Sequence, residues 1–537
     1  MMGRRAVTRI ILVTLFIGAI FAGGAWATVE DHIVRFTASN TPNIDPAQGH
    51  DRASQIALVN LYDPLIFQDY SGNLKDGVAE SWKVSEDGLK YTFRIRDGIF
   101  FHNGDKLTAD DVVFSMKRLL KVKRGFSYLY EGLIKDITKS ADNTVVITLN
   151  EPFGPFLSTL TKFYIVNKKQ VLAHLQEGNY GEFKDYGTKW LINNDAGSGP
   201  YTVVEMAHNQ HLRATKFSNY WKGFKPGNPE GFELLAVSEP VTIKTMMMRK
   251  QLEFTDEYQP AEVYKTLEKV KGIEIFAISN GKMLYLSLNN AKAPTDDVHF
   301  RKALSYAIDY EALLQIFPWR KRAKAPVALS LIGAASDLPY YSYDLETAKK
   351  ELALSKYADN PNKYPLEIAW VADVPDREKL ALAFQTYFDK LGVNVEVVKV
   401  PWAKFVDQAS RLEDTPHGTT ISESSHYSEA GSLLRAIYHS ESIGTYTNTS
   451  WVKYPDIDEA IDKALKKTDI DERIKLYHRA QELIVKHQPH IPIFEEPEVH
   501  TYQSGYLTWE PAEIKKHGKE IIPGLDLLYM RSVQFKK

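Results

Sequence analysis

The sequence predicts an α/β protein of two or three domains, and three observations support this. The chain has 537 residues, whereas a single hydrophobic core stops growing at about 250–300 residues. Helix-like and strand-like patterns alternate along the chain without a repeat. Residues 366–371, 377–391 and 393–400 read as strand, helix and strand, and such a βαβ unit requires a parallel sheet in the second half.

Strands and one capped helix are expected in the first half. Residues 33–38 read as a strand that leads into a proline-rich loop, and 91–95 alternates apolar and polar residues as a half-buried strand does. Thr108 and Asp111 predict a helix start, because their side chains suit the orphan N–H groups there. Apolar residues on one face follow: Val112, Val113, Met116, Leu119 and Leu120. A strand at 144–149 ends this part.

The second half continues the same alternation. The Gly197-Ser198-Gly199-Pro200 stretch breaks the chain before a strand at 201–204. Helix caps and apolar periods predict the elements outside the βαβ unit: a strand at 283–288, a helix from Asp296 or Asp297, helices at 458–467 and 471–486, and a strand at 491–494.

The N-terminal segment predicts export. Arginines within the first nine residues precede an uncharged apolar run at 10–22, and Ala25-Trp26-Ala27 supplies the small-residue pattern of a signal-peptidase site. The apolar run is shorter than the roughly 20 residues of a membrane-spanning helix. A cleaved signal peptide at 1–27, with the mature chain starting near Thr28, is therefore favoured over an anchor. Arg4-Arg5 leaves the Sec and twin-arginine routes both open.

Composition excludes several classes of function. With 66 basic against 68 acidic residues and a net charge of −2, the chain has no basic footprint for nucleic acid. The absence of cysteine excludes disulfides, cysteine-bound zinc, iron–sulfur clusters, thiol nucleophiles and lipid attachment at cysteine. No segment after the leader is apolar enough to span a membrane. We therefore expect an exported, soluble protein.

Five motifs carry a family resemblance. They follow one another over nearly the whole chain after the leader: residues 78–98, 107–115, 197–201 with 219–221, 297–309, and the helical set Arg473, Tyr477 and Gln481. In these motifs the chain resembles the peptide-type extracellular solute-binding proteins of ABC importers (bacterial solute-binding protein family 5). That family includes dipeptide-, oligopeptide- and nickel-binding proteins.

The resemblance implies a two-lobed, hinged α/β fold, the type II periplasmic-binding-protein fold in its three-domain, peptide-binding variant. The implied division is a first lobe of residues 28–73, 197–286 and 494–537, an inserted domain of this lobe at 74–196, and a second lobe at 287–493. The chain is expected to cross between the lobes near 286–290 and 494–496.

The resemblance also implies a function. Family members capture a small solute in the cleft between the lobes and deliver it to ABC permease subunits in the membrane. ATP is hydrolysed on other subunits, which agrees with the lack of a phosphate-binding G-x-x-x-x-G-K-[ST] motif here. We therefore expect a monomeric periplasmic transport protein without catalytic residues, cofactor or metal site.

The class of solute stays open at this point. A peptide-like solute is the default, and an oligosaccharide, an amino-acid conjugate or a metal chelate are the alternatives. An exported hydrolase is a more remote alternative, because the chain has no nucleophile motif to support it.

Six candidate ligand-binding residues lie in loops or at the ends of elements, where cleft residues tend to lie: Asn40, Thr41, Tyr258, Gln259, Trp370 and Trp402. The Asn40-Thr41 loop matches the first-lobe ligand loop of the family, and a plain proline turn explains it equally well. Trp370 could form an aromatic wall of the site or pack in the core.

The segment 420–431 adds Glu423, Ser425 and His426 as candidates. In peptide-binding relatives the matching loop reads Gly-Trp-x-x-Asp, and its Asp pairs with the α-ammonium group of the peptide. Here Glu423 falls at the Trp position and His426 at the Asp position, and a histidine cannot supply the fixed anion that a buried ammonium needs. Glu423 or Glu429 could supply it if the register shifts, or both could be solvated. We expect this loop to line the cleft without anchoring a peptide's amino terminus.

Other polar residues read as scaffold or surface. Asp110 and Asp111 suit a helix cap better than a catalytic pair. Arg377 reads as the opening of a helix, which leaves no evident partner for a dipeptide's carboxylate. Two histidine pairs lack a third metal ligand: His208 with His211, and His487 with His490. Three basic residues read as a solvated loop, with a contact to the permease or an acidic ligand as the alternative: Lys321, Arg322 and Lys324.

Overall fold

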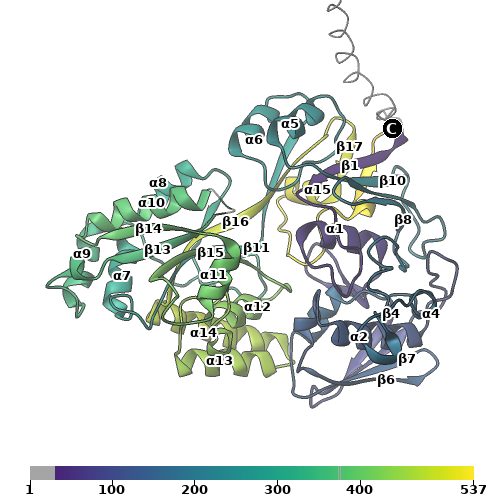
Figure 1. Ribbon diagram of the computed structural model, residues 1–537, viewed down its shortest axis with the longest axis horizontal. Coiled ribbons are helices and arrows are strands. Elements are labelled where there is room, and N and C mark those ends of the chain that lie inside the picture. Colours follow the sequence, from purple (N-terminus) through teal and green to yellow (C-terminus); the bar gives the residue numbers. More distant parts are fainter. Residues whose placement is uncertain (1–30, 373, 375) are drawn as a thin grey trace, which may run out of the picture.

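The computed structural model describes residues 31–372, 374 and 376–537. The signal peptide expected at 1–27 therefore lies outside the described residues. Figure 1 shows two α/β bodies that lie next to each other and are joined by long strands. None of the described helices is both long enough and apolar enough to cross a membrane.

The first body is built on a four-stranded sheet. Its strands lie in the order β1 (Ile33–Ala38), β10 (Gly231–Ala236), β9 (His211–Lys216) and β8 (Tyr201–Ala207). β1 is parallel to β10, and the other neighbours are antiparallel. Smaller elements complete this body: α1 (Arg52–Leu61), β2 (Ile66–Gln68), β3 (Leu74–Asp76), α5 (Pro240–Met248), α6 (Ala261–Leu267), β17 (Leu507–Trp509), α15 (Glu510–Lys516) and β18 (Val533–Phe535). The strand expected at 33–38 is confirmed.

The Gly-Ser-Gly-Pro turn before β8 holds this body together. A Cβ atom on Gly197 would lie 2.0 Å from the carbonyl oxygen of Leu61, so only glycine fits there. The hydroxyl of Ser198 donates to the buried carboxylate of Asp63 at 2.9 Å. The indole N–H of Trp221 donates to the same carboxylate at 3.0 Å. The two parts of this family-like motif, 197–201 and 219–221, thus meet as scaffold at one acid.

A second, antiparallel sheet has the order β4 (Ala79–Val84), β5 (Lys90–Ile95), β7 (Thr144–Leu149) and β6 (Ile134–Ala141). Helix α2 (Ala109–Val122) contacts β6 and β7. At its start the N–H and hydroxyl of Thr108 both donate to the Asp111 carboxylate, at 2.9 and 2.7 Å. The same carboxylate accepts the N–H of Lys168 at 3.0 Å. The expected helix start is confirmed, and Asp111 serves the cap.

The second body is built on a six-stranded sheet. Its strands lie in the order β12 (Lys321–Arg322), β16 (His490–Tyr502), β11 (Glu274–Leu288), β15 (Gly418–Ser424), β13 (Leu366–Val371) and β14 (Val395–Val400). β13 is parallel to β14, and α10 (Asp376–Asp389) connects them. The βαβ unit is therefore confirmed. β15 is parallel to β13 and antiparallel to β11.

Helices cover both faces of the six-stranded sheet. Leu284 and Leu286 of β11 pack in a core with one set: α7 (Val298–Ala307), α8 (Tyr310–Ile316), α9 (Leu345–Leu354) and α10. Met283 and Tyr285 belong to the core on the other face, which involves α12 (Gly431–Leu433), α13 (Pro455–Lys466) and α14 (Ile470–His487). This alternation fixes which side chains of a strand share a face.

Strands β11 and β16 form a ribbon that links the two bodies (Figure 1). Their pairing shifts between Ser279 and Lys282, so Asn280 and Gly281 are not paired with β16. Gly281 has a φ of +81°, a left-handed conformation that glycine adopts without strain. From Lys282 onward β11 also pairs with β15. Residues 286–290, where the chain is expected to cross between the lobes, therefore lie further into the six-stranded sheet than this break in pairing.

Candidate functional site

The parallel strands of the second body end at one edge of the sheet. Ligands of α/β proteins bind outside the carboxyl ends of such strands. β14 leads there into α11 (Trp402–Ala409), and β15 leads into Ser425 and His426. The broken ribbon meets the same edge, because the N–H of Ser425 donates to the carbonyl oxygen of Gly281 at 3.2 Å. Trp402, which is 43% exposed, and the 420–431 candidates therefore flank one edge.

Glu423 is a nearly buried carboxylate at this edge. Its side chain lies on the face of Met283, its antiparallel partner, and the residue is only 5% exposed. The ring nitrogen Nε2 of His426 lies 3.3 Å from Oε1 of Glu423 and is its only ion-pair partner among the described residues. No hydrogen bond to the Glu423 carboxylate is present within that same part of the chain. Such a group can still accept a donor.

The rings of Tyr128 and Tyr446, from different bodies, lie close enough to Glu423 to feel its charge. The ring of Tyr128, from the body that carries the antiparallel sheet, lies 5.1 Å from the ring of His426. The rings of Tyr446 and Trp402 also lie 5.1 Å apart. Burial and the nearby negative charge of Glu423 raise the pKa of Tyr446 to about 12, and they raise the pKa of Tyr128 as well. The site thus combines one acid with several ring faces.

The second acid of the segment, Glu429, is already engaged. It accepts two hydrogen bonds from the Arg473 guanidinium, at 2.7 and 3.0 Å. The hydroxyl of Tyr477 donates to it at 3.1 Å, and that of Ser158 lies at 3.5 Å. A third motif of the family pattern is therefore scaffold, and Glu423 is the acid that remains available.

The opposite face of the same edge carries a basic cluster. Arg377 lies at the start of α10, as expected, and its guanidinium contacts Ser422 and donates to Glu496 at 3.2 Å. Arg320 and Lys282 lie 3.5 and 3.6 Å from the same carboxylate. Burial would raise the pKa of Glu496, but these three cations lower it below its ordinary value. The cluster therefore keeps Glu496 ionised and holds α10 against the ribbon.

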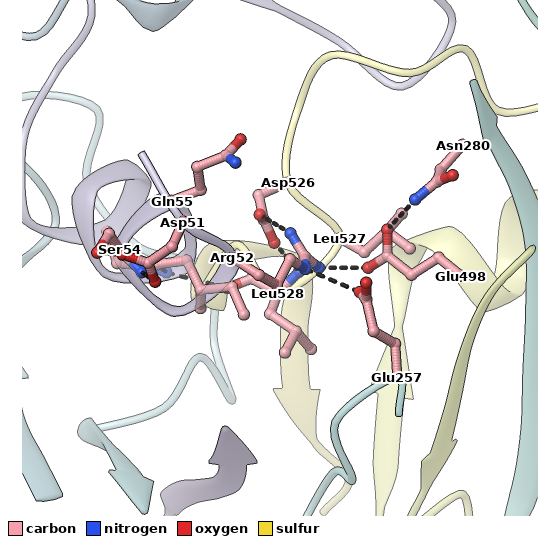
Figure 2. Close-up of polar contacts among 12 residues, drawn as sticks. Asp51, Arg52, Ser54, Gln55, Glu257, Asn280, Glu498, Asp526, Leu527 and Leu528 are labelled. Carbon is pink, nitrogen blue, oxygen red and sulfur yellow. Dashed lines mark hydrogen bonds and ion pairs between the residues drawn. The ribbon is translucent and has the colours of Figure 1, made fainter. Parts of the chain in front are cut away.

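An acidic cluster around Arg52 lies on the other side of the ribbon break (Figure 2). Nε of Arg52 donates to Glu257 at 2.8 Å, and its terminal nitrogens pair with Glu498 and Asp526. Asn280, from the break, donates its amide to Glu498 at 3.0 Å. Three carboxylates from different segments thus converge on one guanidinium.

The first-body candidates lie near this cluster but make few free contacts. Tyr258 is exposed and lines a pocket of about 280 Å³ beside Arg52. Gln259 is buried, and its amide donates to both carboxylate oxygens of Asp256 at 3.0 Å. Thr41 accepts the N–H of Asn209 at 3.3 Å. Gln259 and Thr41 therefore hold the local backbone and side chains in place.

Two of the remaining candidates lie apart from the acid. Asn40 is exposed, and its amide donates to the carbonyl oxygen of Thr41 at 3.1 Å. Trp370 is only 3% exposed and packs in the core of the second body with Leu380 and Phe384. The structure thus brings Glu423, Ser425, His426 and Trp402 to one edge and leaves the other candidates in the first body or in the core.

Sequence reasoning missed the residues that the other body or the ribbon contributes. Tyr128 lies in an aromatic-rich stretch, Phe126-Ser-Tyr-Leu-Tyr130, which was the one local signal for a surface with exposed rings. Asn280-Gly281 is a dipeptide typical of turns, and it marks the break in the ribbon. No local sequence pattern indicated that Arg52 binds three carboxylates, because its partners lie more than 200 residues away.

Fold and site together define a solute-binding protein rather than an enzyme. The family profile described as "Bacterial extracellular solute-binding proteins, family 5 Middle" matches residues 73–480. The chain therefore belongs to the family 5 bacterial extracellular solute-binding proteins, the substrate-binding components of ABC importers.

Individual relatives resemble the chain over most of its length. The probable D,D-dipeptide-binding periplasmic protein DdpA of Escherichia coli (strain K12) is 26% identical over 90% of this chain and 92% of its own length. The glutathione-binding protein GsiB of Escherichia coli O1:K1 / APEC is 28% identical over 91% and 93%. The structure of HbpA2 from Haemophilus parasuis superposes with a TM-score of 0.79 at 24% identity, covering 94% of this chain and 100% of that one.

Proposed function

We propose that the protein binds an amine-bearing solute at the carboxyl edge of the second body, with the cationic group against Glu423. The observation that carries this is the burial of Glu423 to 5% exposure without a hydrogen bond from the described residues. A buried carboxylate is costly unless it is paired. An ammonium group would supply both the charge and the donors that Glu423 lacks.

The surrounding rings support a cationic group. Ring faces attract cations through their quadrupole, by about 0.5–2 kcal/mol each when water is excluded. Tyr128 and Tyr446 lie near the acid, and Trp402 contacts the ring of Tyr446. His426 is the present neighbour of Glu423, and a stronger donor from the solute would replace it. An uncharged sugar would offer Glu423 hydroxyl donors but no positive charge.

A peptide-like solute fits these requirements best. Relatives that match over 90% or more of the chain are named for D,D-dipeptides and for glutathione. Such solutes carry a free amine, which Glu423 would recognise. On this proposal Glu423 would take the role that the Asp of the family motif has in peptide binders. The proposal departs here from the expectation that this loop lines the cleft without anchoring an amino terminus.

Closure of the two bodies would bury the solute. The pairing break at 279–282 offers two residues that can change their backbone angles without breaking a ladder bond to β16. We place the hinge at this break and at the facing part of β16, with the domain division otherwise as given above. Delivery would be to an ABC permease, from the periplasm in which relatives are named.

Calorimetry with matched ligands tests the proposal. We expect a free-amine dipeptide to bind and its N-acetylated form to bind hundreds-fold more weakly, because an unpaired buried charge costs about 3–5 kcal/mol. Glu423→Gln should weaken the free-amine ligand to a similar extent. The control Glu413→Gln, at an exposed loop acid, should change affinity less than about twofold.

Two outcomes would contradict the proposed role of Glu423. If free-amine and acetylated ligands bind equally, or if Glu423→Gln leaves the affinity of the free-amine ligand intact, Glu423 is not the cation-binding group. Binding that persists without Glu423 but still requires the amine would place the contact on another acid.

A further inference from the structure

A second pocket lies in the second body, along the edge strand β12. The space between its walls is about 420 Å³ when the part open to solvent is included. Its walls combine tyrosine and proline rings with two basic side chains: Tyr310, Tyr340, Pro326, Pro492, Arg322 and Lys324. These basic residues belong to the stretch that reads as a solvated loop from the sequence alone.

Arg322 is held in place by two rings. Its guanidinium carbon lies 4.2 Å from the ring centroid of Tyr310 and 4.8 Å from that of Tyr340. Rings that stack on a guanidinium occupy its faces and leave its N–H edge free. The Nε atom is buried and has no hydrogen-bond partner among the described residues. The two terminal nitrogens are not among the buried atoms, and they can take a bidentate oxyanion.

Lys324 adds a second positive charge. Its ammonium nitrogen lies 5.4 Å from the Tyr340 ring centroid. Neither Lys324 nor Arg322 forms an ion pair with any carboxylate in the described part of the chain. Basic side chains that line a pocket without acidic partners attract an anion.

His490 gives the inner wall a neutral acceptor. Its Nε2 faces the carbonyl oxygen of Ile437 at 3.3 Å, so Nε2 carries the proton and Nδ1 keeps its lone pair. Burial lowers the pKa of His490 to about 3, which keeps the ring neutral. Nδ1 is buried without a partner among residues 31–372, 374 and 376–537. A ligand that reaches this wall could donate a hydrogen bond to it.

The pocket is separate from the proposed solute site. None of the residues that line it belongs to the segment 420–431, and Tyr128, Trp402 and Tyr446 do not line it either.

We propose that this pocket binds a compact carboxylate with a planar apolar body. The carboxylate would bridge the N–H edge of Arg322 and the ammonium group of Lys324. The apolar body would pack against the tyrosine and proline rings, where its burial is favourable. One guanidinium, one ammonium group and the neighbouring rings match a molecule with a single acid group and a single ring.

Benzoate is a suitable probe, and two alanines report on it. Ala323 and Ala325 line the pocket, so selective ¹³C-methyl labelling of alanine places any binding there by NMR. We expect benzoate to shift both methyl signals with one-site saturation. Inorganic phosphate and benzyl alcohol, which carry only the anion or only the ring, should bind at least about tenfold more weakly.

Variants distinguish binding of benzoate in the pocket from non-specific binding to surface charge. Arg322→Gln should weaken benzoate by about ten- to a hundredfold, because charge-assisted hydrogen bonds contribute about 1.5–3 kcal/mol. Arg322→Lys, which keeps the charge but loses the fork, should be intermediate. Lys321→Gln, at the exposed neighbour in β12, should change affinity less than about twofold. The melting temperature of each variant verifies that it folds.

Several results would overturn the proposal. Benzoate at about 10 mM that shifts neither alanine methyl would show that the pocket is no carboxylate site. Shifts that Arg322→Gln leaves unchanged, or that phosphate produces equally well, would assign binding to surface charge. If Arg322→Gln weakens docking to permease-containing vesicles while benzoate never binds, the pocket belongs to a protein interface instead.

Discussion

Asn280 donates its side-chain amide to the carboxylate of Glu498 at the point between Ser279 and Lys282 where the ribbon between the two bodies loses its pairing. Glu498 in turn pairs with Arg52 of the first body and accepts from His500 at 2.8 Å. The break is therefore tied to the buried acids of the first body on one side. On the other side Lys282, the residue after Gly281, lies 3.6 Å from Glu496.

The hinge should depend on Gly281. A Cβ atom there would lie 3.1 Å from a methyl of Leu331, 3.2 Å from Ser425 and 3.3 Å from Pro523, at a φ of +81°. We expect Gly281→Ala to cost about 1 kcal/mol or more in stability and to reduce the compaction that ligand produces in X-ray scattering. Gly392→Ala, with φ +71° and no atom within 4 Å, carries the backbone strain alone. Equal ligand-induced compaction in both variants would place the hinge elsewhere.

Glu423 and Glu429 should respond oppositely to neutralisation. Glu423 accepts no hydrogen bond from the described residues, and His426 is its one ion-pair partner among them. Glu423→Gln removes this weakly compensated buried charge, so the ligand-free protein should gain about 1–3 kcal/mol in unfolding free energy. Glu429→Gln breaks the pair with Arg473 and should lose about 3–5 kcal/mol. Urea unfolding of the ligand-free proteins measures both. A loss of stability in Glu423→Gln would show that this carboxylate is satisfied within the fold.

The helix cap of α2 should matter for stability only. Thr108→Ala removes one hydroxyl donor to Asp111 and should cost about 1 kcal/mol. Asp111→Ala should cost more, because the same carboxylate also accepts the N–H groups of Thr108 and Lys168. Solute affinity should stay unchanged in both. A large drop in affinity at unchanged stability would make this cap part of the site.

Stability should fall with rising pH because of Glu253. Burial raises its pKa from 4.5 to about 7, although the Arg35 N–H and the Tyr506 hydroxyl donate to it. Since the folded pKa lies above the unfolded one, the contribution of Glu253 is complete below about pH 4.5. It is lost as pH rises to about 7, by about 2–4 kcal/mol. Glu253→Gln should flatten this slope in urea titrations between pH 5 and 8, and an unchanged slope would refute the assignment.

Much of the fold could be predicted, because local patterns determined it. The strand at 33–38, the capped helix start at Thr108 and the βαβ unit depend on periods and caps within a few residues. Trp370 shows the limit of such reasoning. A tryptophan at the end of a strand suits a cleft or a core equally well. In the structure Trp370 lies in the core because α10 packs on β13.

The site was less predictable, because its contacts are long-range. Glu423 and Glu429 look alike in the sequence, and only Arg473, 44 residues beyond Glu429, distinguishes them. Tyr128 reaches His426 from the other body. Neither contact has a local signature, so alignment to the family motif indicated the segment but could not choose between its two acids.

Native mass spectrometry of the freshly purified protein tests the central claim most directly, since closed binding proteins retain their solute. We expect a one-to-one complex whose ligand carries a free amine and is released chemically unchanged on unfolding. The complex should be absent from Glu423→Gln and present in Glu413→Gln. A retained ligand without a cationic group, or a ligand that the protein converts into a product, would contradict the proposed solute site.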